Sequence, residues 1–209
     1  MKRFLKFHEY LNEEFKNYPF LDPKKRNRIN IFDVDDTLVV TDSKIKVTDN
    51  KTGKVFTLSP QDFNEYERKK HHELDFSDFK NPDILKAGKI IDWVFEILRK
   101  TMKRDKAVGI ITARDDRKLI YDFLLHSGVH IHPDFIFAVS DPKEFDIKKP
   151  ISHNKKEAFR KLMDLGFNEF NFFDDDLENL KLAKSLEDEY PEVKIRTKHI
   201  KQKWIPRKD

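Results

Sequence analysis

Residues 29–38 read Ile29-Asn30-Ile31-Phe32-Asp33-Val34-Asp35-Asp36-Thr37-Leu38, and this stretch decides the fold. An apolar segment leads directly into two carboxylates, Asp33 and Asp35, which are spaced i, i+2. In an extended strand this spacing places both side chains on the same side. Neighbouring anions repel each other unless a cation lies between them. Mg²⁺ prefers hard oxygen ligands and commonly uses one or two carboxylates together with phosphate oxygens. The stretch therefore predicts a phosphoryl-transfer site with Asp33 as the candidate nucleophile.

The composition sets the broad class of the protein. The 209 residues suffice for one α/β domain with a small inserted module. Hydrophobic and charged residues each make up 38% of the chain, so a core is possible beneath a highly ionic surface, and the 19 Phe residues must supply much of its volume. The net charge of +4 is only a weak indication of polyanionic partners.

The absence of cysteine excludes disulfides and thiolate metal sites and is compatible with a reducing cytoplasm. We therefore expect a cytoplasmic protein. The opening Met1-Lys2-Arg3-Phe4-Leu5-Lys6-Phe7 resembles openings of tailed-phage proteins. If the chain is phage-encoded, we expect the host cytoplasm, with packaging into a virion as the alternative. No apolar run approaches the roughly 20 residues needed to span a bilayer, so we expect no membrane partner. The sequence does not predict an oligomeric state.

Strands and helices alternate along most of the chain. The sequence predicts strands at 28–32, 107–111, 135–139, 170–173 and 193–196, and helices at 84–103, 115–127, 154–165 and 177–186. This alternation predicts an α/β fold with a three-layer, Rossmann-like parallel sheet covered by helices on both faces. In such sheets the ligand binds at the carboxyl ends of the strands.

Differences in pattern divide the chain into segments. An amphipathic helix over 3–17 is followed by a linker, and the insert carries a hairpin (44–47 with 54–58) and a helix expected from Ser59-Pro60 through Lys70. The predicted segments are 1–27 (N-terminal helix and linker), 28–40 with 89–197 (core), 41–88 (insert) and 198–209 (basic tail).

Polar residues follow the predicted core strands in a fixed order, and a parallel sheet would bring them to one crevice. They are Asp33 and Asp35 after the first strand, Thr112 and Arg114 after the second, Lys155 or Lys156 at the start of a helix, and Asp174 and Asp175 after the fourth strand.

In this order the residues resemble the four motifs of the haloacid-dehalogenase-like (HAD) phosphohydrolase superfamily. The resemblance covers roughly residues 28–197 apart from the insert, and it implies that residues 41–88 form a small type 1 cap between the first and second strands. It also implies Mg²⁺-dependent hydrolysis of phosphomonoesters through an aspartyl-phosphate. Asp36 occupies a position that is often Gly in the family, although Asp is also seen there.

The resemblance also implies residue roles. Asp33 would attack phosphorus, Asp35 would act as general acid and then as base, and Thr112 and the lysine would contact the phosphoryl group. Lys155 is preferred because Ala158, Phe159 and Leu162 form the buried helix face, with Lys156 left open. The implied Mg²⁺ ligands are Asp33, the backbone carbonyl of Asp35, and Asp174, with Asp175 assisting.

The substrate expected from the sequence is a nucleic-acid end or a nucleotide, especially a polynucleotide 3′-phosphate. Arg114 lies two residues after Thr112, as in the phosphatase domains of phage-type polynucleotide kinases, and it would contact either phosphate or a surface acid. The alternative is a non-enzymatic nucleic-acid-binding or phage structural protein that retains the fold. Phosphotransfer to an acceptor other than water would use the same residues.

Two groups of histidines raise the question of a second kind of metal site. They are His71-His72 and the trio His126, His130 and His132. Zn²⁺ needs three or four converging ligands, and the sequence shows no such convergence. We therefore expect no histidine metal site.

Overall fold

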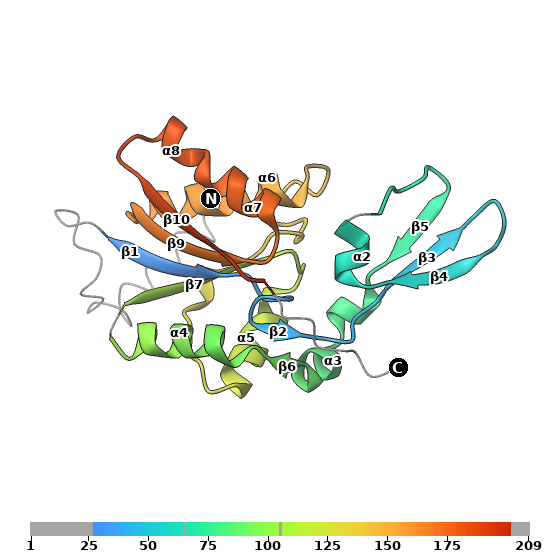
Figure 1. Ribbon diagram of the computed structural model, residues 1–209, viewed down its shortest axis with the longest axis horizontal. Helices are drawn as coiled ribbons and strands as arrows, with labels where there is room; N and C mark the ends of the chain where they lie inside the picture. The colour runs from blue at the N-terminus through green and yellow to red at the C-terminus, as the bar shows by residue number, and fades with distance from the viewer. Residues whose placement is uncertain (1–26, 65, 105, 202–209) are drawn as a thin grey trace.

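A five-stranded parallel sheet forms the centre of the molecule (Figure 1). The computed structural model describes residues 27–64, 66–104 and 106–201, so the expected helix over 3–17 and most of the basic tail lie outside the described residues. The strand order is β10-β9-β1-β7-β8, and every neighbouring pair is parallel. The strands are β1 (Arg28–Phe32), β7 (Ala107–Thr112), β8 (Ile136–Ala138), β9 (Glu169–Asp174) and β10 (Lys194–His199).

Helices cover both faces of this sheet, as Figure 1 shows. One face carries α4 (Asp92–Met102) and α5 (Arg117–His126), and the other carries α6 (Ile151–Asp164), α7 (Leu177–Lys184) and the short α8 (Leu186–Glu189). The predicted α/β architecture with a parallel sheet is therefore confirmed, and its form is compatible with a Rossmann-like fold. No helix among the described residues has the length and apolar character that crossing a bilayer requires.

Phenylalanine fills much of the core, as the composition predicted. Phe159 on α6 packs edge-on against Phe170 and Phe172 of β9, with ring centroids 5.4 and 5.0 Å apart. Such fully buried side chains each contribute about 1.5–3 kcal/mol through removal of apolar surface from water. The helix covering this face is thereby fixed against the central strands.

The register of the sheet aligns the ends of its central strands. Phe32 pairs with Phe173 on one side and with Ile110 on the other. One residue further, the amide of Asp33 donates to the carbonyl of Phe173 (2.9 Å). The residues that follow β1, β7 and β9 therefore emerge at the same edge.

The insert between β1 and α4 forms a separate antiparallel sheet of order β4-β3-β5. Its elements are β3 (Ile45–Asp49), β4 (Val55–Leu58), α2 (Pro60–Asn64), β5 (His72–Asp75) and the 3-10 helix η1 (Ser77–Lys80). The predicted hairpin and the helix start at Ser59, whose Oγ accepts from the amide of Asp62 (3.1 Å), are confirmed. The helix through Lys70 is wrong, because the chain leaves α2 to place β5 against the open edge of β3.

The single helix expected at 84–103 is also wrong. It is divided into α3 (Pro82–Ala87) and α4 by Gly88 and by β6 (Lys89–Ile90), which pairs with β2 (Val39–Val40). A Cβ at position 88 would lie 2.6 Å from Val39 Cγ2, so glycine permits the close approach that this pairing requires. Ile90 and Ile91 thus match a helical pattern but lie before the helix begins.

Other predicted bounds differ by a few residues. α6 begins at Ile151 instead of residue 154, and the expected edge strand at 193–196 extends to His199. Lys198 and His199 pair with Phe173 and Asp174 of β9. The predicted boundary between core and tail at residue 198 is therefore wrong, because hydrogen bonding to β9 continues past it.

We predict that Gly88→Ala lowers the free energy of unfolding by about 1–3 kcal/mol, the usual cost of overpacking. The added methyl would meet Val39 Cγ2, Thr41 Cγ2 and the Val40 carbonyl, two side chains and a backbone atom that all lie in the packed β2 region. Gly53→Ala is the comparison, since its φ of 72° strains a side chain but nothing lies within 4 Å. Urea unfolding curves that show G88A no less stable than G53A would contradict this packing argument.

Candidate functional site

A buried lysine joins two buried aspartates at the carboxyl edge of the sheet. Lys155 Nζ lies 2.8 Å from Asp33 Oδ1 and 2.7 Å from Asp174 Oδ2. The three side chains come from the end of β1, from α6 and from the last residue of β9. The Asp174 side chain is fully enclosed, whereas that of Asp33 is 6% exposed. The structure thus brings Asp33 against Lys155 and Asp174, although more than 100 positions separate it from either residue in the sequence.

The neighbouring lysine points elsewhere. Lys156 Nζ donates to Ser185 Oγ (3.0 Å) and also contacts Glu189. One position along a helix turns a side chain by about 100°, so only one of the two lysines can face the strand ends. Of the two candidates left open by the sequence, Lys155 lies in the acidic cluster.

Both oxygens of Asp174 are occupied by hydrogen-bond donors. Asn179 Nδ2 lies 3.1 and 3.2 Å from them, and the amide of Asp176 donates to Oδ1 (2.8 Å). The sequence reasoning missed Asn179. Asn179 lies three residues after Asp176, the N-cap of α7. This spacing puts both residues on one helix face, and it could have indicated that Asn179 lies near the strand end at Asp174.

Asp33 and Asp175 keep oxygens without strong protein partners. Asp33 Oδ2 accepts no hydrogen bond from any described residue. Since no fully enclosed side-chain oxygen in the described part of the chain lacks a partner, this atom reaches solvent. Asp175 Oδ1 accepts only a long hydrogen bond from Thr37 (3.5 Å), while His199 Nε2 lies 2.9 Å from the Asp175 carbonyl. Asp33 Oδ2 and the weakly bonded carboxylate of Asp175 are therefore available to a ligand.

Burial and mutual repulsion perturb the acids of the cluster. Burial raises the pKa of Asp33 well above its ordinary range, with Lys155 opposing this and Asp174 reinforcing it. Burial together with the charge of Asp174 raises the pKa of Asp175 to about 7. Burial alone would lower the pKa of Lys155, but Asp174 and Asp33 outweigh it and raise the pKa above its ordinary value. One lysine therefore does not neutralise this group of carboxylates.

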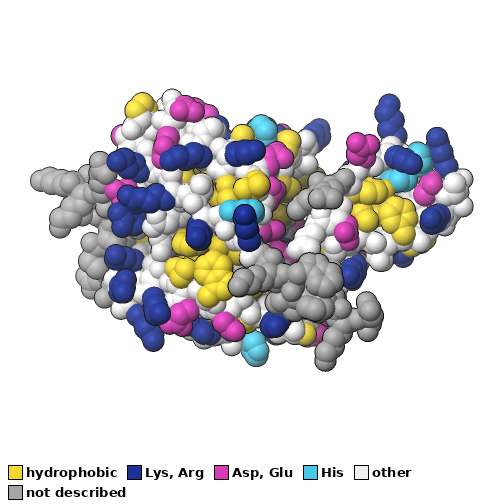
Figure 2. Space-filling view, in the orientation of Figure 1, with side chains coloured by type: hydrophobic (Ala, Val, Ile, Leu, Met, Phe, Trp, Pro, Cys, Tyr) yellow, Lys and Arg dark blue, Asp and Glu magenta, His cyan; other side chains and the backbone are white. Residues whose placement is uncertain are grey.

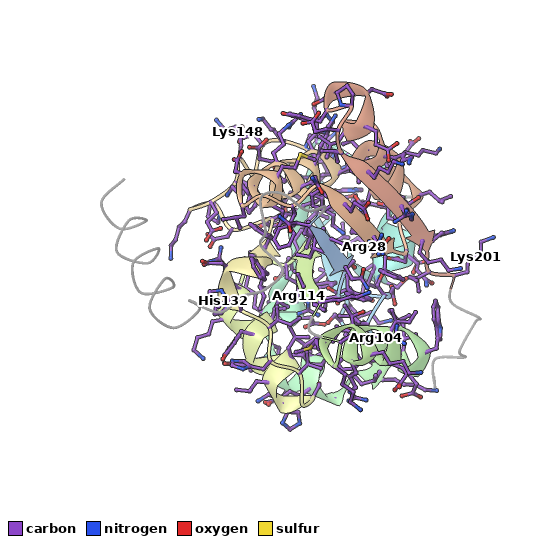
Figure 3. All side chains as sticks on the ribbon, turned by 90° about the vertical axis from the view of Figure 1, so that its left-hand side faces the viewer. Arg28, Arg104, Arg114, His132, Lys148 and Lys201 are labelled. Carbon is purple, nitrogen blue, oxygen red and sulfur yellow. The ribbon has the colours of Figure 1, made fainter. Side chains whose placement is uncertain are left out.

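Arg114 holds Asp35 in a two-point ion pair. Its Nε and second terminal nitrogen lie 2.9 and 2.7 Å from the two oxygens of Asp35. The remaining terminal nitrogen donates to the carbonyl of Phe79 in the insert, and the guanidinium carbon lies 5.3 Å from the Phe79 ring centroid. In Figure 3 Arg114 is labelled near the middle of the projection, whereas Lys148 and Lys201 lie at its outline. Arg114 is a buried side chain, so the surface ion pair left open by the sequence is wrong.

Thr112 is fully buried beside Arg114. Its Oγ1 accepts a long hydrogen bond (3.4 Å) from the amide of Arg114, and its carbonyl accepts from Val139. Thr112 therefore shapes the loop after β7. Phe79 was missed by the sequence reasoning, because nothing in its local pattern indicates a contact with a residue 35 positions away.

The donor set of the site fits a hard divalent cation. Five carboxylates gather around two cationic side chains: Asp33, Asp35, Asp36, Asp174 and Asp175 against Lys155 and Arg114. No three of these acids offer oxygens within 4.8 Å of one another. The side chains alone therefore do not enclose an ion, and Mg²⁺ commonly completes its octahedral shell with water and substrate oxygens.

A scan against models of known protein families finds no match for this chain, and a search of curated proteins finds no similar sequence.

We predict that Lys155→Met lowers the free energy of unfolding by about 3–5 kcal/mol, because it leaves two buried carboxylates without their cation. Lys156→Met removes an equally long side chain whose partner Glu189 is 41% exposed, and it should cost about 1 kcal/mol or less. Chemical denaturation of both variants at neutral pH tests this difference. Equal losses would show that Lys155 does not act as the shared counterion.

We predict that the metal-free protein becomes less stable as the pH rises from about 4 to about 7. The pKa of Asp175 rises from 3.8 to about 7 on folding, so in this interval the folded state binds more protons than the unfolded chain, and the free energy of unfolding falls with pH. Asp175→Asn should flatten this slope, while Asn at the exposed Asp42 should not. Thermal melts in a chelator across this pH range measure it, and parallel slopes for wild type and D175N would contradict it.

Proposed function

We propose that this protein is a Mg²⁺-dependent phosphomonoesterase of the HAD type, with the insert as a small cap over the site. The observation that carries the proposal is the state of Asp33. One of its oxygens is held by Lys155, and the other reaches solvent at the carboxyl edge of a parallel sheet. A carboxylate fixed in this way is a nucleophile with one oxygen aimed at an incoming ester.

The metal would be held by Asp33, the backbone carbonyl of Asp35 and Asp175. When bound, Mg²⁺ supplies positive charge to the phosphoryl oxygens and offsets the excess of carboxylates. Asp174 is less suited to be a ligand than the resemblance implied, because Lys155, Asn179 and the amide of Asp176 occupy its oxygens. We assign Asp174 the role of holding Lys155 against Asp33.

The chain's own residues carry the proton and bond changes. Asp33 Oδ2 attacks phosphorus and forms an acyl phosphate, while the bond between phosphorus and the leaving oxygen breaks and that oxygen takes a proton from Asp35. A water molecule then attacks phosphorus and gives a proton back to Asp35. The bond between Asp33 and phosphorus breaks, which releases phosphate and regenerates both carboxyl groups.

Arg114 positions the proton carrier and remains able to bind phosphate. It occupies one lone pair on each oxygen of Asp35, which fixes the carboxylate plane and leaves further lone pairs for the proton. Three of the five guanidinium N–H groups are used by Asp35 and Phe79. The remaining two would donate to a phosphoryl oxygen without breaking the ion pair once a substrate reaches this side chain, which is 1% exposed in the structure.

As the substrate we propose a nucleic-acid end or nucleotide, with a polynucleotide 3′-phosphate as the favoured case. The support is a row of aromatic rings that leads away from Arg114 along the insert. Phe79 contacts Phe76 (6.2 Å between centroids), which contacts Phe63 (5.5 Å). Phe76 is 39% exposed, and exposed aromatic rings are platforms on which nucleobases stack. Arg68, Lys69 and Lys70 form a short exposed basic run nearby in the sequence.

The function is tested by release of inorganic phosphate from a panel of esters with and without Mg²⁺. The panel contains a 3′-phosphorylated oligonucleotide, a 3′-nucleotide, a sugar phosphate and p-nitrophenyl phosphate. We expect Mg²⁺-dependent turnover that falls at least about 10³-fold in Asp33→Asn, since loss of a nucleophile removes the covalent route. Asn at the exposed Asp42 is the matched control and should retain the wild-type rate.

The outcomes separate the competing functions. Equal kcat/KM for the oligonucleotide and the sugar phosphate would contradict the proposed polynucleotide substrate but would still support phosphatase activity. No turnover of any ester, together with salt-dependent oligonucleotide binding that survives D33N, would favour the non-enzymatic nucleic-acid-binding protein.

A further inference from the structure

Three side chains able to ligate a metal converge on the three-stranded sheet of the insert, separate from the parallel sheet whose first strand precedes Asp33. Asp49 ends β3, His72 begins β5 directly opposite it, and His71 precedes His72. One ligand atom from each lies within 4.8 Å of the other two. Within the described ranges 27–64, 66–104 and 106–201, this is the one group of three such residues with this geometry. We call it the insert histidine site.

The separations are close to those of a bound metal. His71 Nε2 lies 3.5 Å from Asp49 Oδ1, and ligands at about 2.0–2.1 Å in a tetrahedral Zn²⁺ site lie roughly 3.3 Å apart. The rings of His71 and His72 meet edge to face with centroids 4.7 Å apart. The His71 side chain is 25% exposed, so its imidazole has room for the small movement that would bring all three ligand atoms to the distance of a bound metal.

Neighbouring groups orient the ligands. A ring nitrogen of the buried His72, Nδ1, is in hydrogen-bond contact with the Tyr66 hydroxyl, which leaves Nε2 for a metal. Asp49 is fixed by the amide of Lys51 (2.8 Å) and the hydroxyl of Thr52 (2.8 Å). Outer partners of this kind set the tautomer and direction of metal ligands. Asp49 Oδ1 also accepts a long hydrogen bond from the amide of Thr52 (3.4 Å), whereas Oδ2 accepts only from the Thr52 hydroxyl among the described residues and keeps a lone pair for a metal.

A metal bound at the insert histidine site would stabilise the small sheet of the insert. The three strands of the insert form a small sheet with few fully buried side chains, of which Ile45 and Val47 lie on β3. Modules of this size commonly need a disulfide or a metal to hold them, and the chain has no cysteine. An ion here would tie the end of β3 to the start of β5. Figure 2 shows histidine beside a hydrophobic patch on this part of the surface.

We propose that Asp49, His71 and His72 bind a transition-metal dication of borderline softness, for which Zn²⁺ is the natural probe. Two imidazole nitrogens and one carboxylate oxygen suit Zn²⁺ and disfavour Mg²⁺. Water or a substrate atom takes the fourth position. The ion holds the strands of the insert together and is distinct from the cation proposed at Asp33 and Asp175. The proposal of this site therefore does not depend on whether the protein is a phosphatase.

The test is calorimetric titration of the tag-free full-length protein with Zn²⁺ in excess Mg²⁺, followed by thermal melts of the loaded and unloaded forms. We expect one equivalent to bind and to raise the melting temperature. His71→Gln should weaken binding at least about tenfold, the scale of losing an interaction that tunes or forms a metal shell. His126→Gln, which changes a histidine on α5, is the matched control and should bind as wild type does.

Absorption spectra of the Co²⁺ form provide a second readout, because a tetrahedral Co²⁺ site absorbs far more strongly in the visible range than an octahedral one. Loss of this band in H71Q but not in D33N would support the insert histidine site. Equal Zn²⁺ affinity in wild type and H71Q would overturn it, as would binding that disappears in D33N and survives in H71Q.

Discussion

The contact of Lys155 with both Asp33 and Asp174 is the interaction on which the site depends. Burying two carboxylates and an ammonium group costs desolvation energy that their mutual attraction offsets only when the geometry is good. Apolar side chains of similar volume would fill the same space at the end of the strands more cheaply. A cluster of this kind therefore destabilises the fold relative to apolar packing, and its presence indicates that the charges serve binding or catalysis. Perturbed buried ionisable groups at the carboxyl edge of a parallel sheet are where binding and catalysis are expected.

Arg114 extends this charged centre into the insert. It is the side chain that holds Asp35 through both of its oxygens and at the same time contacts the carbonyl and the ring of Phe79. The adjacent pair Lys80 and Asp115 joins the same two segments by a more exposed contact of 2.8 Å. A movement of the insert would therefore shift Arg114 and displace Asp35, which is the residue proposed to carry the proton. Arg114 thus links the row of aromatic rings to Asp35 directly.

The sequence was most informative where chemistry and periodicity agree. The apolar run before Asp33 and the one before Asp174 each predicted a buried strand and a polar edge, and both strands formed with that register. The buried helix face led the sequence analysis to prefer Lys155, which the structure places in the cluster. Lys156 stayed open because a shift of one helical position decides which way the side chain points. The helices expected through Lys70 and over 84–103 failed because strand pairing outweighed local helical spacing, at β5 and at Gly88. The convergence of Asp49 with His71 and His72 also depends on strand pairing, so no local pattern could reveal it.

The most direct measurement is mass spectrometry of the protein quenched in acid during turnover of a phosphate ester with Mg²⁺. The account predicts one added phosphoryl group on the peptide that contains Asp33, stable in acid and removed by hydroxylamine, and absent from the Asp33→Asn variant. Ester hydrolysis without any phosphorylated peptide, or with the label on another residue, would contradict the assignment of Asp33 as the nucleophile held by Lys155.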